Sequence, residues 1–74
     1  MNNEDRKEIT ALVEQLEAIK DEVERLADDL QDRSDNMPES FEERANILTD
    51  QAERVSESVE HISEAIDSLT GAGE

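Results

Sequence analysis

Apolar side chains recur along the chain in two long stretches, with spacings that alternate between three and four residues. The first stretch comprises Ile9, Leu12, Leu16, Ile19, Val23, Leu26 and Leu30. The second comprises Phe41, Ala45, Leu48, Ala52, Val55, Val59, Ile62, Ile66 and Leu69. This spacing places the side chains on one stripe of an α-helix. The pattern therefore predicts two long amphipathic helices, although low hydrophobicity and high charge are by themselves typical of disorder.

The only proline of the chain, Pro38, lies between the two stretches. Proline lacks a backbone N–H and disfavours helical backbone at the residue before it. We therefore predict one domain, residues 1–74, with a first helix over about 4–34, a loop at 35–37 and a second helix over about 38–70. Residues 71–74 are expected to fray.

Residues at the predicted helix ends are suitable caps. Asn2 or Asn3 can accept hydrogen bonds from the first turn of the first helix. Ser40 and Glu43 have the spacing of a capping box for the second helix. Gly71 is expected to end that helix, because glycine is common just past a helix C-terminus.

A link this short predicts that the two helices pack as an antiparallel hairpin. Residue numbers that sum to about 75 should then lie at the same level of the hairpin. This places Leu16 near Val59 and Leu26 near Leu48.

The residues beside the two apolar stripes indicate packing against further helices. With Ile9 at heptad position a and Leu48 at position d, the e positions of the first helix are Val13, Lys20 and Ala27. Those of the second helix are Thr49, Ser56, Ser63 and Thr70. A two-stranded coiled coil prefers charged e and g positions, whereas small or apolar ones suit a larger bundle.

We therefore expect an all-α hairpin that dimerises into a four-helix bundle. All the apolar residues of the two stretches except Ala45 and Ala52 form the predicted oligomer core. A chain of 74 residues is marginal as a monomer. Parallel and antiparallel docking of the two hairpins are both compatible with the sequence.

The charge of the chain restricts its partners. Asp and Glu number 22 against 7 Lys and Arg, which gives a formal net charge of −15. Such a charge repels phosphate backbones and anionic lipids, so we expect neither direct nucleic-acid binding nor membrane binding. No apolar run is long enough to span a bilayer, no signal-peptide pattern is seen and cysteine is absent, which favours the cytoplasm.

A basic protein surface is the partner that this charge favours. No Lys or Arg follows Arg54, so that the acids of the second helix are uncompensated there. The predicted docking residues are Glu57, Glu60, Glu64 and Asp67, with Met37 in the loop as a candidate anchor.

Catalysis, metal binding and cofactor binding have little support, and we expect no enzyme and no cofactor. His61 lies between Glu57 and Glu64 at helical spacing, which is more typical of a solvated face than of a metal site. Glu64-Ala-Ile-Asp67 matches half of the acidic motif of all-α nucleotide pyrophosphatases, so a metal-dependent hydrolase is one alternative. The other alternative is an oligomer that sequesters a small nucleotide-like ligand beside the row Thr49, Ser56, Ser63 and Thr70.

The loop Asp35-Asn-Met-Pro-Glu-Ser40, with Arg6-Lys7 and Ala65-Ile-Asp-Ser-Leu69, resembles a family of small acidic helical-hairpin proteins encoded by bacterial phages, prophages and plasmids. The chain departs from that family at Asp32-Arg-Ser and at Glu42-Glu-Arg. The family has no agreed catalytic residues to transfer. The resemblance implies a mobile-element protein of the bacterial cytoplasm, acting as an accessory or anti-defence factor.

Overall fold

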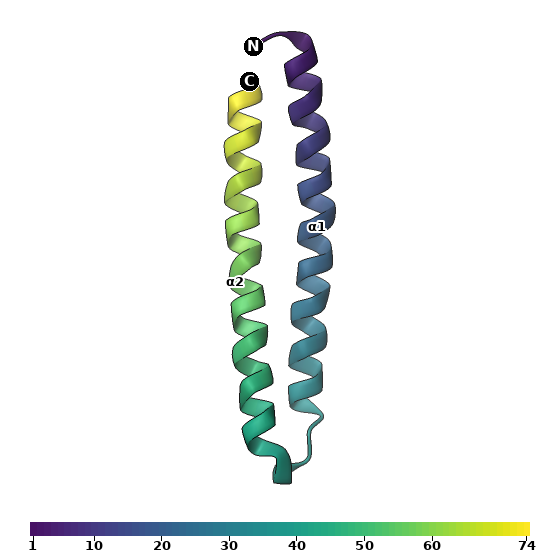
Figure 1. Cartoon of the computed structure of the whole chain (residues 1–74), viewed down its shortest axis with the longest axis vertical. Coiled ribbons are helices and arrows are strands. Elements are labelled where there is room, and N and C mark those ends of the chain that lie inside the picture. The colour runs from purple at the N-terminus through teal and green to yellow at the C-terminus, as the bar shows by residue number, and fades with distance from the viewer.

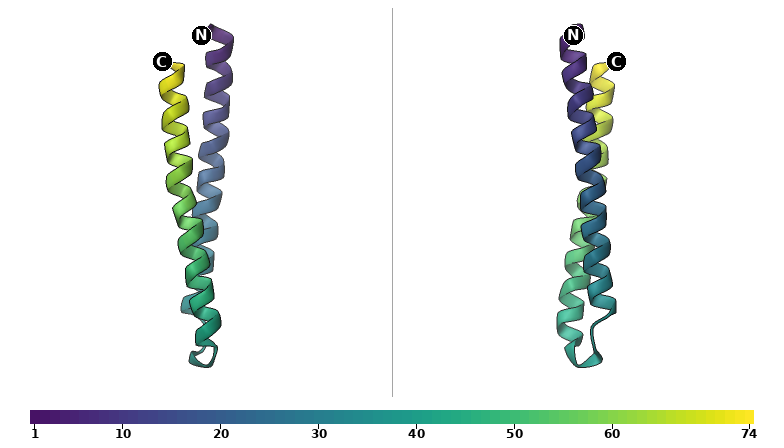
Figure 2. Two further views of the ribbon diagram at one scale, coloured as in Figure 1. Left: turned by 60° about the vertical axis from the view of Figure 1, so that its left-hand side comes forward. Right: turned by 90° about the vertical axis from the view of Figure 1, so that its right-hand side faces the viewer.

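The structure, a computed structural model, describes all residues 1–74 and is an antiparallel hairpin of two long helices. Helix α1 spans Asn3–Asp35 and helix α2 spans Glu42–Gly73, with a short 3-10 turn, η1, at Glu39–Phe41 between them. The helices run side by side over their whole length and both termini lie at the end opposite the loop (Figure 1). The rod measures 59 × 14 × 10 Å, and the two helices cross over one another slightly when viewed from other sides (Figure 2). The predicted all-α hairpin is confirmed.

The N-terminus of α1 is capped by Asn2. Its side-chain oxygen accepts a hydrogen bond of 2.8 Å from the backbone N–H of Asp5. Asn2 has extended backbone, as an N-cap residue does, and Asn3 is already helical. Of the two asparagines that the sequence offered, the structure therefore selects the first.

The link between the helices differs from the predicted loop. The N–H of Asn36 donates to the carbonyl of Asp32 and closes α1. Pro38 is extended, and the N–H of Phe41 donates to the carbonyl of Pro38 within the 3-10 turn. Helix α2 begins at Glu42 and not at residue 38, because Pro38 has extended backbone and the 3-10 turn follows it before the α-helix begins.

The predicted capping box at the start of the second helix is wrong. Ser40 lies inside the 3-10 turn, and no side chain caps the N-terminus of η1 or of α2. Gly71 also does not end α2, since the helix continues to Gly73 without a positive φ angle at either glycine. A glycine favours a helix end but does not impose one.

The register of the hairpin corrects the predicted pairing. The hydroxyl of Ser34 donates to the carbonyl of Ala45, and Ile9 lies against Gly73. Residue numbers at one level therefore sum to about 82 and not to about 75, a shift of about two helical turns. The cause is the 3-10 turn, which carries the chain beyond the end of α1 before α2 returns (Figure 1).

Little of the single hairpin is buried. Only Ala27, Ser34 and Ala52 are buried, and no large side chain is fully enclosed. Small side chains dominate the contact between the helices near the loop, where Ser34 also lies 2.6 Å from the hydroxyl of Thr49. Most residues of the two apolar stretches are only half-buried, so the contact between the two helices leaves much apolar surface in water.

Candidate interaction surfaces

Helix α1 packs against α2 with heptad positions a and e, and not with a and d. Every a residue from Ile9 to Leu30 and every e residue from Val13 to Ser34 is half-buried or buried. The apolar d residues point away from this contact and are exposed. They are Leu12 (42% exposed), Ile19 (48%) and Leu26 (43%), and we call them the apolar stripe. With Phe41 (46% exposed), four members of the predicted oligomer core thus lie outside the core of the single chain.

One side of the hairpin carries a series of shallow grooves. They are lined by Val13, Lys20 and Ala27 of α1, together with Ser56, Ser63 and Thr70 of α2. These six residues, all at e positions, define the groove face. Because the e positions of both helices share this side, the d and g positions of α1 and the g and c positions of α2 share the opposite side.

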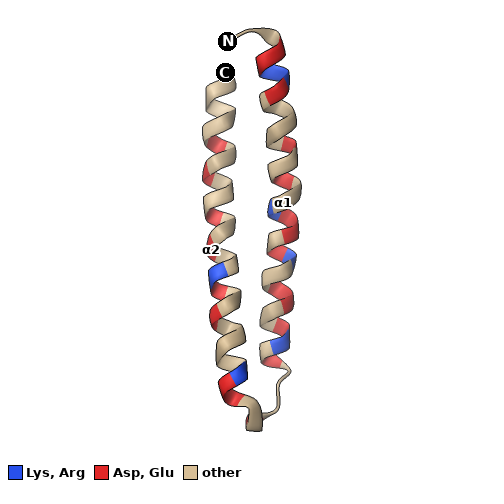
Figure 3. Ribbon diagram, viewed as in Figure 1, with Lys and Arg blue, Asp and Glu red and all other residues tan.

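The acids of α2 lie in one ridge. From Glu43 to Asp67, every acidic residue of this helix is at heptad position b or f, outside the a and d rows that pack against α1. We call these residues the acidic ridge, and they are Glu43, Asp50, Glu53, Glu57, Glu60, Glu64 and Asp67. All seven are exposed. The red bands of α2 in Figure 3 show this ridge, with no blue band between the middle of the helix and its C-terminus.

Helix α1 has a comparable row of acids at b and f positions. It runs through Glu14, Glu17, Asp21, Glu24, Asp28 and Asp35. Glu17, Asp21 and Asp28 line the grooves on the groove face, as Glu53 and Asp67 of α2 do. The groove face is therefore bordered by acids from both helices.

The c and g positions of α2 contain no acid at all. They are occupied by Arg44, Ile47, Gln51, Arg54, Ser58, His61, Ala65, Ser68 and Ala72, which we call the acid-free face. This face adjoins the apolar stripe of α1 on the side opposite the grooves. In a chain with 22 acids among 74 residues, a row of nine positions without one is a distinct surface.

The predicted docking residues are placed as follows. Glu57, Glu60, Glu64 and Asp67 form consecutive members of the acidic ridge in the half of α2 nearer the C-terminus. Met37 lies at the loop end, remote from them. The structure thus brings the four acids together and separates them from the methionine.

No metal site is formed. His61 Nδ1 lies 3.9 Å from a carboxylate oxygen of Glu64, and both side chains are more than three-quarters exposed. No group of three His, Asp or Glu side chains is arranged to hold a metal ion. Glu64 and Asp67, the half-motif of the hydrolase alternative, project from the same exposed ridge as Glu57 and Glu60.

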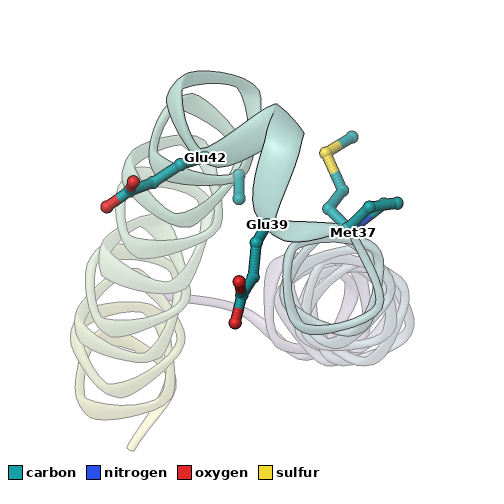
Figure 4. A pocket seen from close by; sticks show the side chains of 5 residues that line it. Met37, Glu39 and Glu42 are labelled. Carbon is teal, nitrogen blue, oxygen red and sulfur yellow. The ribbon is translucent and has the colours of Figure 1, made fainter.

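The loop end has a shallow hollow of about 420 Å³, lined by Met37, Pro38, Glu39, Glu42 and Ala45. Met37 is half-buried, and Figure 4 shows Glu42 pointing away from it. Two of the five lining residues are acids, so that an apolar partner group would meet carboxylates at the rim. Met37 as an anchor for a partner stays a prediction.

The hydroxyl row proposed for a small ligand lies along the groove face. Thr49 is used within the fold, since it pairs with Ser34. Ser56, Ser63 and Thr70 remain at the surface or half-buried, with Lys20 and Arg6 as the only cations lining the grooves. Acids outnumber those cations, which disfavours an anionic ligand such as a nucleotide.

Sequence reasoning missed two of these surfaces. Val13 and Ala27 indicate the exposure of the apolar stripe, because they give α1 a second apolar row at its e positions. When α2 packs against that row, the d row stays exposed and can contact another partner. The acid-free face was also readable, because it needs only the heptad positions of the acids in the second helix. The exposure of the apolar stripe, in contrast, also depends on which of the two adjacent apolar rows of α1 is covered by α2.

Comparison with protein-family models, with curated proteins and with solved structures gives no match to this chain. The likeness to the phage-encoded hairpin family therefore stays a prediction from the loop Asp35–Ser40, with Arg6-Lys7 and Ala65–Leu69. Neither helix has a segment long and apolar enough to cross a membrane.

Proposed function

We propose that the protein is a non-enzymatic interaction protein that acts as a homodimer and docks to a basic protein surface. Docking uses the half of the acidic ridge nearer the C-terminus, which consists of Glu57, Glu60, Glu64 and Asp67. The observation that carries the proposal is the segregation of charge on α2. Acids occupy only its b and f positions from Glu43 to Asp67, and its c and g positions have none. Acids that served only to keep the protein soluble would not need to be restricted to the b and f positions.

The form of the ridge supports docking to a protein. Its seven acids are exposed on a rigid helix, with spacings of three or four residues over most of its length. Only Asp50 has an ion pair with an arginine, Arg54, at 3.2 Å. A row of unneutralised carboxylates attracts a partner with clustered lysines and arginines, and the attraction weakens as salt screens it.

Surface area supports the homodimer. The chain exposes 5681 Å², whereas a compact chain of 8.3 kDa exposes about 4,600 Å². Two copies that each covered the excess of about 1,100 Å² would bury about 2,200 Å², as obligate homodimers do. We propose that the dimer is the four-helix bundle that the sequence predicts.

Cellular context follows from the family resemblance as part of the same proposal. A mobile-element protein in the bacterial cytoplasm meets many basic surfaces, above all those that host proteins use for nucleic acids. A rod of fixed carboxylates competes for such surfaces without binding nucleic acid itself. An accessory or anti-defence role is consistent with that competition.

Charge reversal tests the docking proposal. The untagged wild type and the variant Glu57→Lys, Glu60→Lys, Glu64→Lys are used to capture proteins from a bacterial lysate at 50 and 500 mM salt, about a tenfold change in ionic strength. A captured protein is then purified and its affinity is measured. We expect a basic partner that binds the wild type at low salt and is lost both at high salt and with the variant.

The matched control reverses the same number of acids in the loop half of the ridge, as Glu43→Lys, Asp50→Lys, Glu53→Lys. It has the same net charge as the first variant but keeps the predicted docking residues. Binding that survives in the control and not in the first variant supports the predicted site. Equal binding by the wild type and both variants contradicts the proposal.

A further inference from the structure

The side of the hairpin opposite the grooves combines the apolar stripe with the acid-free face. At each level where a large residue of the stripe is exposed on α1, α2 presents a small one. Residue numbers at one level sum to about 82, so Leu12, Ile19 and Leu26 lie close to the levels of Ala72, Ala65 and Ser58. Beside the three large side chains of the stripe, the g positions of α2 are thus small, while the larger Arg54 and His61 lie at the c positions farther from α1.

We infer that this side binds a second copy of the chain with the two loops at the same end, so that α1 of each copy lies on α2 of the other. The inference rests on the proposed homodimer and specifies its interface and orientation. Two hairpins stacked on these sides by a two-fold axis have only two arrangements. The axis runs either along the helices, with loops together, or across them, with loops apart.

Shape favours the arrangement with the loops together. There, the large residues of the apolar stripe lie over the small residues Ala65 and Ser58 of the second copy, and the converse holds on the other side of the axis. With the loops apart, α1 lies on α1 and α2 on α2. Large residues then oppose large ones and small oppose small, which leaves gaps that close packing does not tolerate.

Charge favours the same arrangement independently. The g positions of α1, next to the apolar stripe, are Glu8, Gln15, Glu22 and Asp29. With the loops together, they meet the c positions of α2 in the second copy. At equal levels, Asp29 faces the second copy's Arg54 and Glu22 faces the second copy's His61.

With the loops apart, these g positions of α1 meet one another. Three of the four are acids and the fourth is glutamine, so every register of that arrangement brings acids near acids. The basic and neutral residues of the acid-free face would then meet only themselves. The complementarity between the two helices exists only when α1 lies on α2 of the second copy.

The dimer with the loops together leaves the acidic ridges in solvent. The stacked sides contain no member of either b and f row, so both groove faces point outward on opposite sides of the bundle. The dimer therefore presents the docking acids twice. A partner with two basic surfaces, or two partner molecules, can be bound at once.

Distances between spin labels test the orientation. The chain has no cysteine, so a single cysteine at exposed Ser40 or at Gly71, where added atoms meet open space, labels one end of the rod. Each label is measured in its own homodimer, and an equal mixture of the two singly labelled proteins reports the distance between the ends. The rod is 59 Å long, and neighbouring helix axes are about 8–10 Å apart.

With the loops together, both homodimers give distances below about 30 Å and the mixture adds a distance near the length of the rod. With the loops apart, each homodimer gives the long distance and the mixture adds the short one, which overturns the orientation but leaves the homodimer standing. Absence of any distance between copies overturns the homodimer as well.

A charge swap between Asp29 and Arg54 tests the same orientation by a second measurement. Arg54→Glu should raise the dimer dissociation constant about fivefold, because the pair with Asp29 occurs twice per dimer. Adding Asp29→Arg to Arg54→Glu should restore the wild-type value. Lys7→Glu, an equal change of charge at an f position of α1, is the control and should have less effect. Failure of the double variant to recover affinity contradicts the predicted contact.

Discussion

The hydroxyl oxygen of Ser34 lies 2.6 Å from that of Thr49 and 2.7 Å from the carbonyl oxygen of Ala45. This pair of contacts sets the register of the hairpin near the loop. It connects the last turn of α1 to the first turns of α2, and Ser34 is one of only three buried residues. Two small hydroxyl residues let the helices approach closely there while each polar atom keeps a partner.

Replacement of Ser34 by alanine should destabilise the protein by about 1 kcal/mol, because the Thr49 hydroxyl loses its partner inside the contact. Replacement by leucine should cost more, since the close approach leaves no room for the side chain. Urea unfolding followed by circular dichroism measures both. Ser40→Ala, at an exposed position, is the control. Equal stability of Ser34→Ala and Ser40→Ala would show that the register is set elsewhere.

The N-terminal cap predicts a difference between two adjacent asparagines. Asn2→Ala removes the side-chain acceptor of the Asp5 N–H and should cost about 0.5–1 kcal/mol of stability. Asn3→Ala places a better helix former within α1 and should be neutral or slightly stabilising. Thermal unfolding of both variants checks the assignment. A larger loss with Asn3→Ala would mean that the helix begins one residue later.

The glycines near the C-terminus should respond differently to alanine. Gly71 lies within α2 with open space around it, so Gly71→Ala should stabilise the helix by up to about 0.8 kcal/mol. At Gly73 the added methyl group comes within 3.4 Å of Ile9, so the gain should be smaller. Melting temperatures of the two variants report the difference. A lower melting temperature for Gly71→Ala would indicate that the helix ends before Gly73.

Salt should stabilise the free protein while it weakens docking. The net charge of −15 makes the folded rod repel itself, and screening reduces that repulsion. We expect the melting temperature to rise by several degrees between 10 and 500 mM NaCl, as the Debye length falls to about a seventh of its low-salt value. Sodium chloride titration followed by circular dichroism tests this. A melting temperature that falls with salt would mean that ion pairs outweigh the repulsion.

The sequence predicted the two helices, their antiparallel pairing and the position of the break, because the three-and-four spacing and Pro38 are local signals. It did not predict the register. The register follows from the 3-10 turn after Pro38 and from contacts such as that between Ser34 and Ala45, which lie eleven positions apart in the sequence. A change of a few residues in the turn moves every pair along both helices.

The candidate surfaces differ in how far the sequence alone predicts them. The acids at Glu57, Glu60 and Glu64 could be placed on one ridge from their spacing alone. The exposure of Leu12, Ile19 and Leu26 could not, because it depends on which of two adjacent apolar rows α2 covers. The e residues Val13 and Ala27 decide that competition, since their small size lets α2 approach closely.

Native mass spectrometry of the untagged protein, over a dilution series, is the most direct test of the homodimer on which the account depends. We predict a species of about 16.6 kDa, twice the mass of the chain, that persists at micromolar concentration. The variant Ile19→Glu, which places a charge in the middle of the apolar stripe, should give the monomer of 8.3 kDa with reduced helix content. A wild-type protein that is a fully helical monomer at these concentrations, or a dimer that Ile19→Glu leaves intact, would contradict the account.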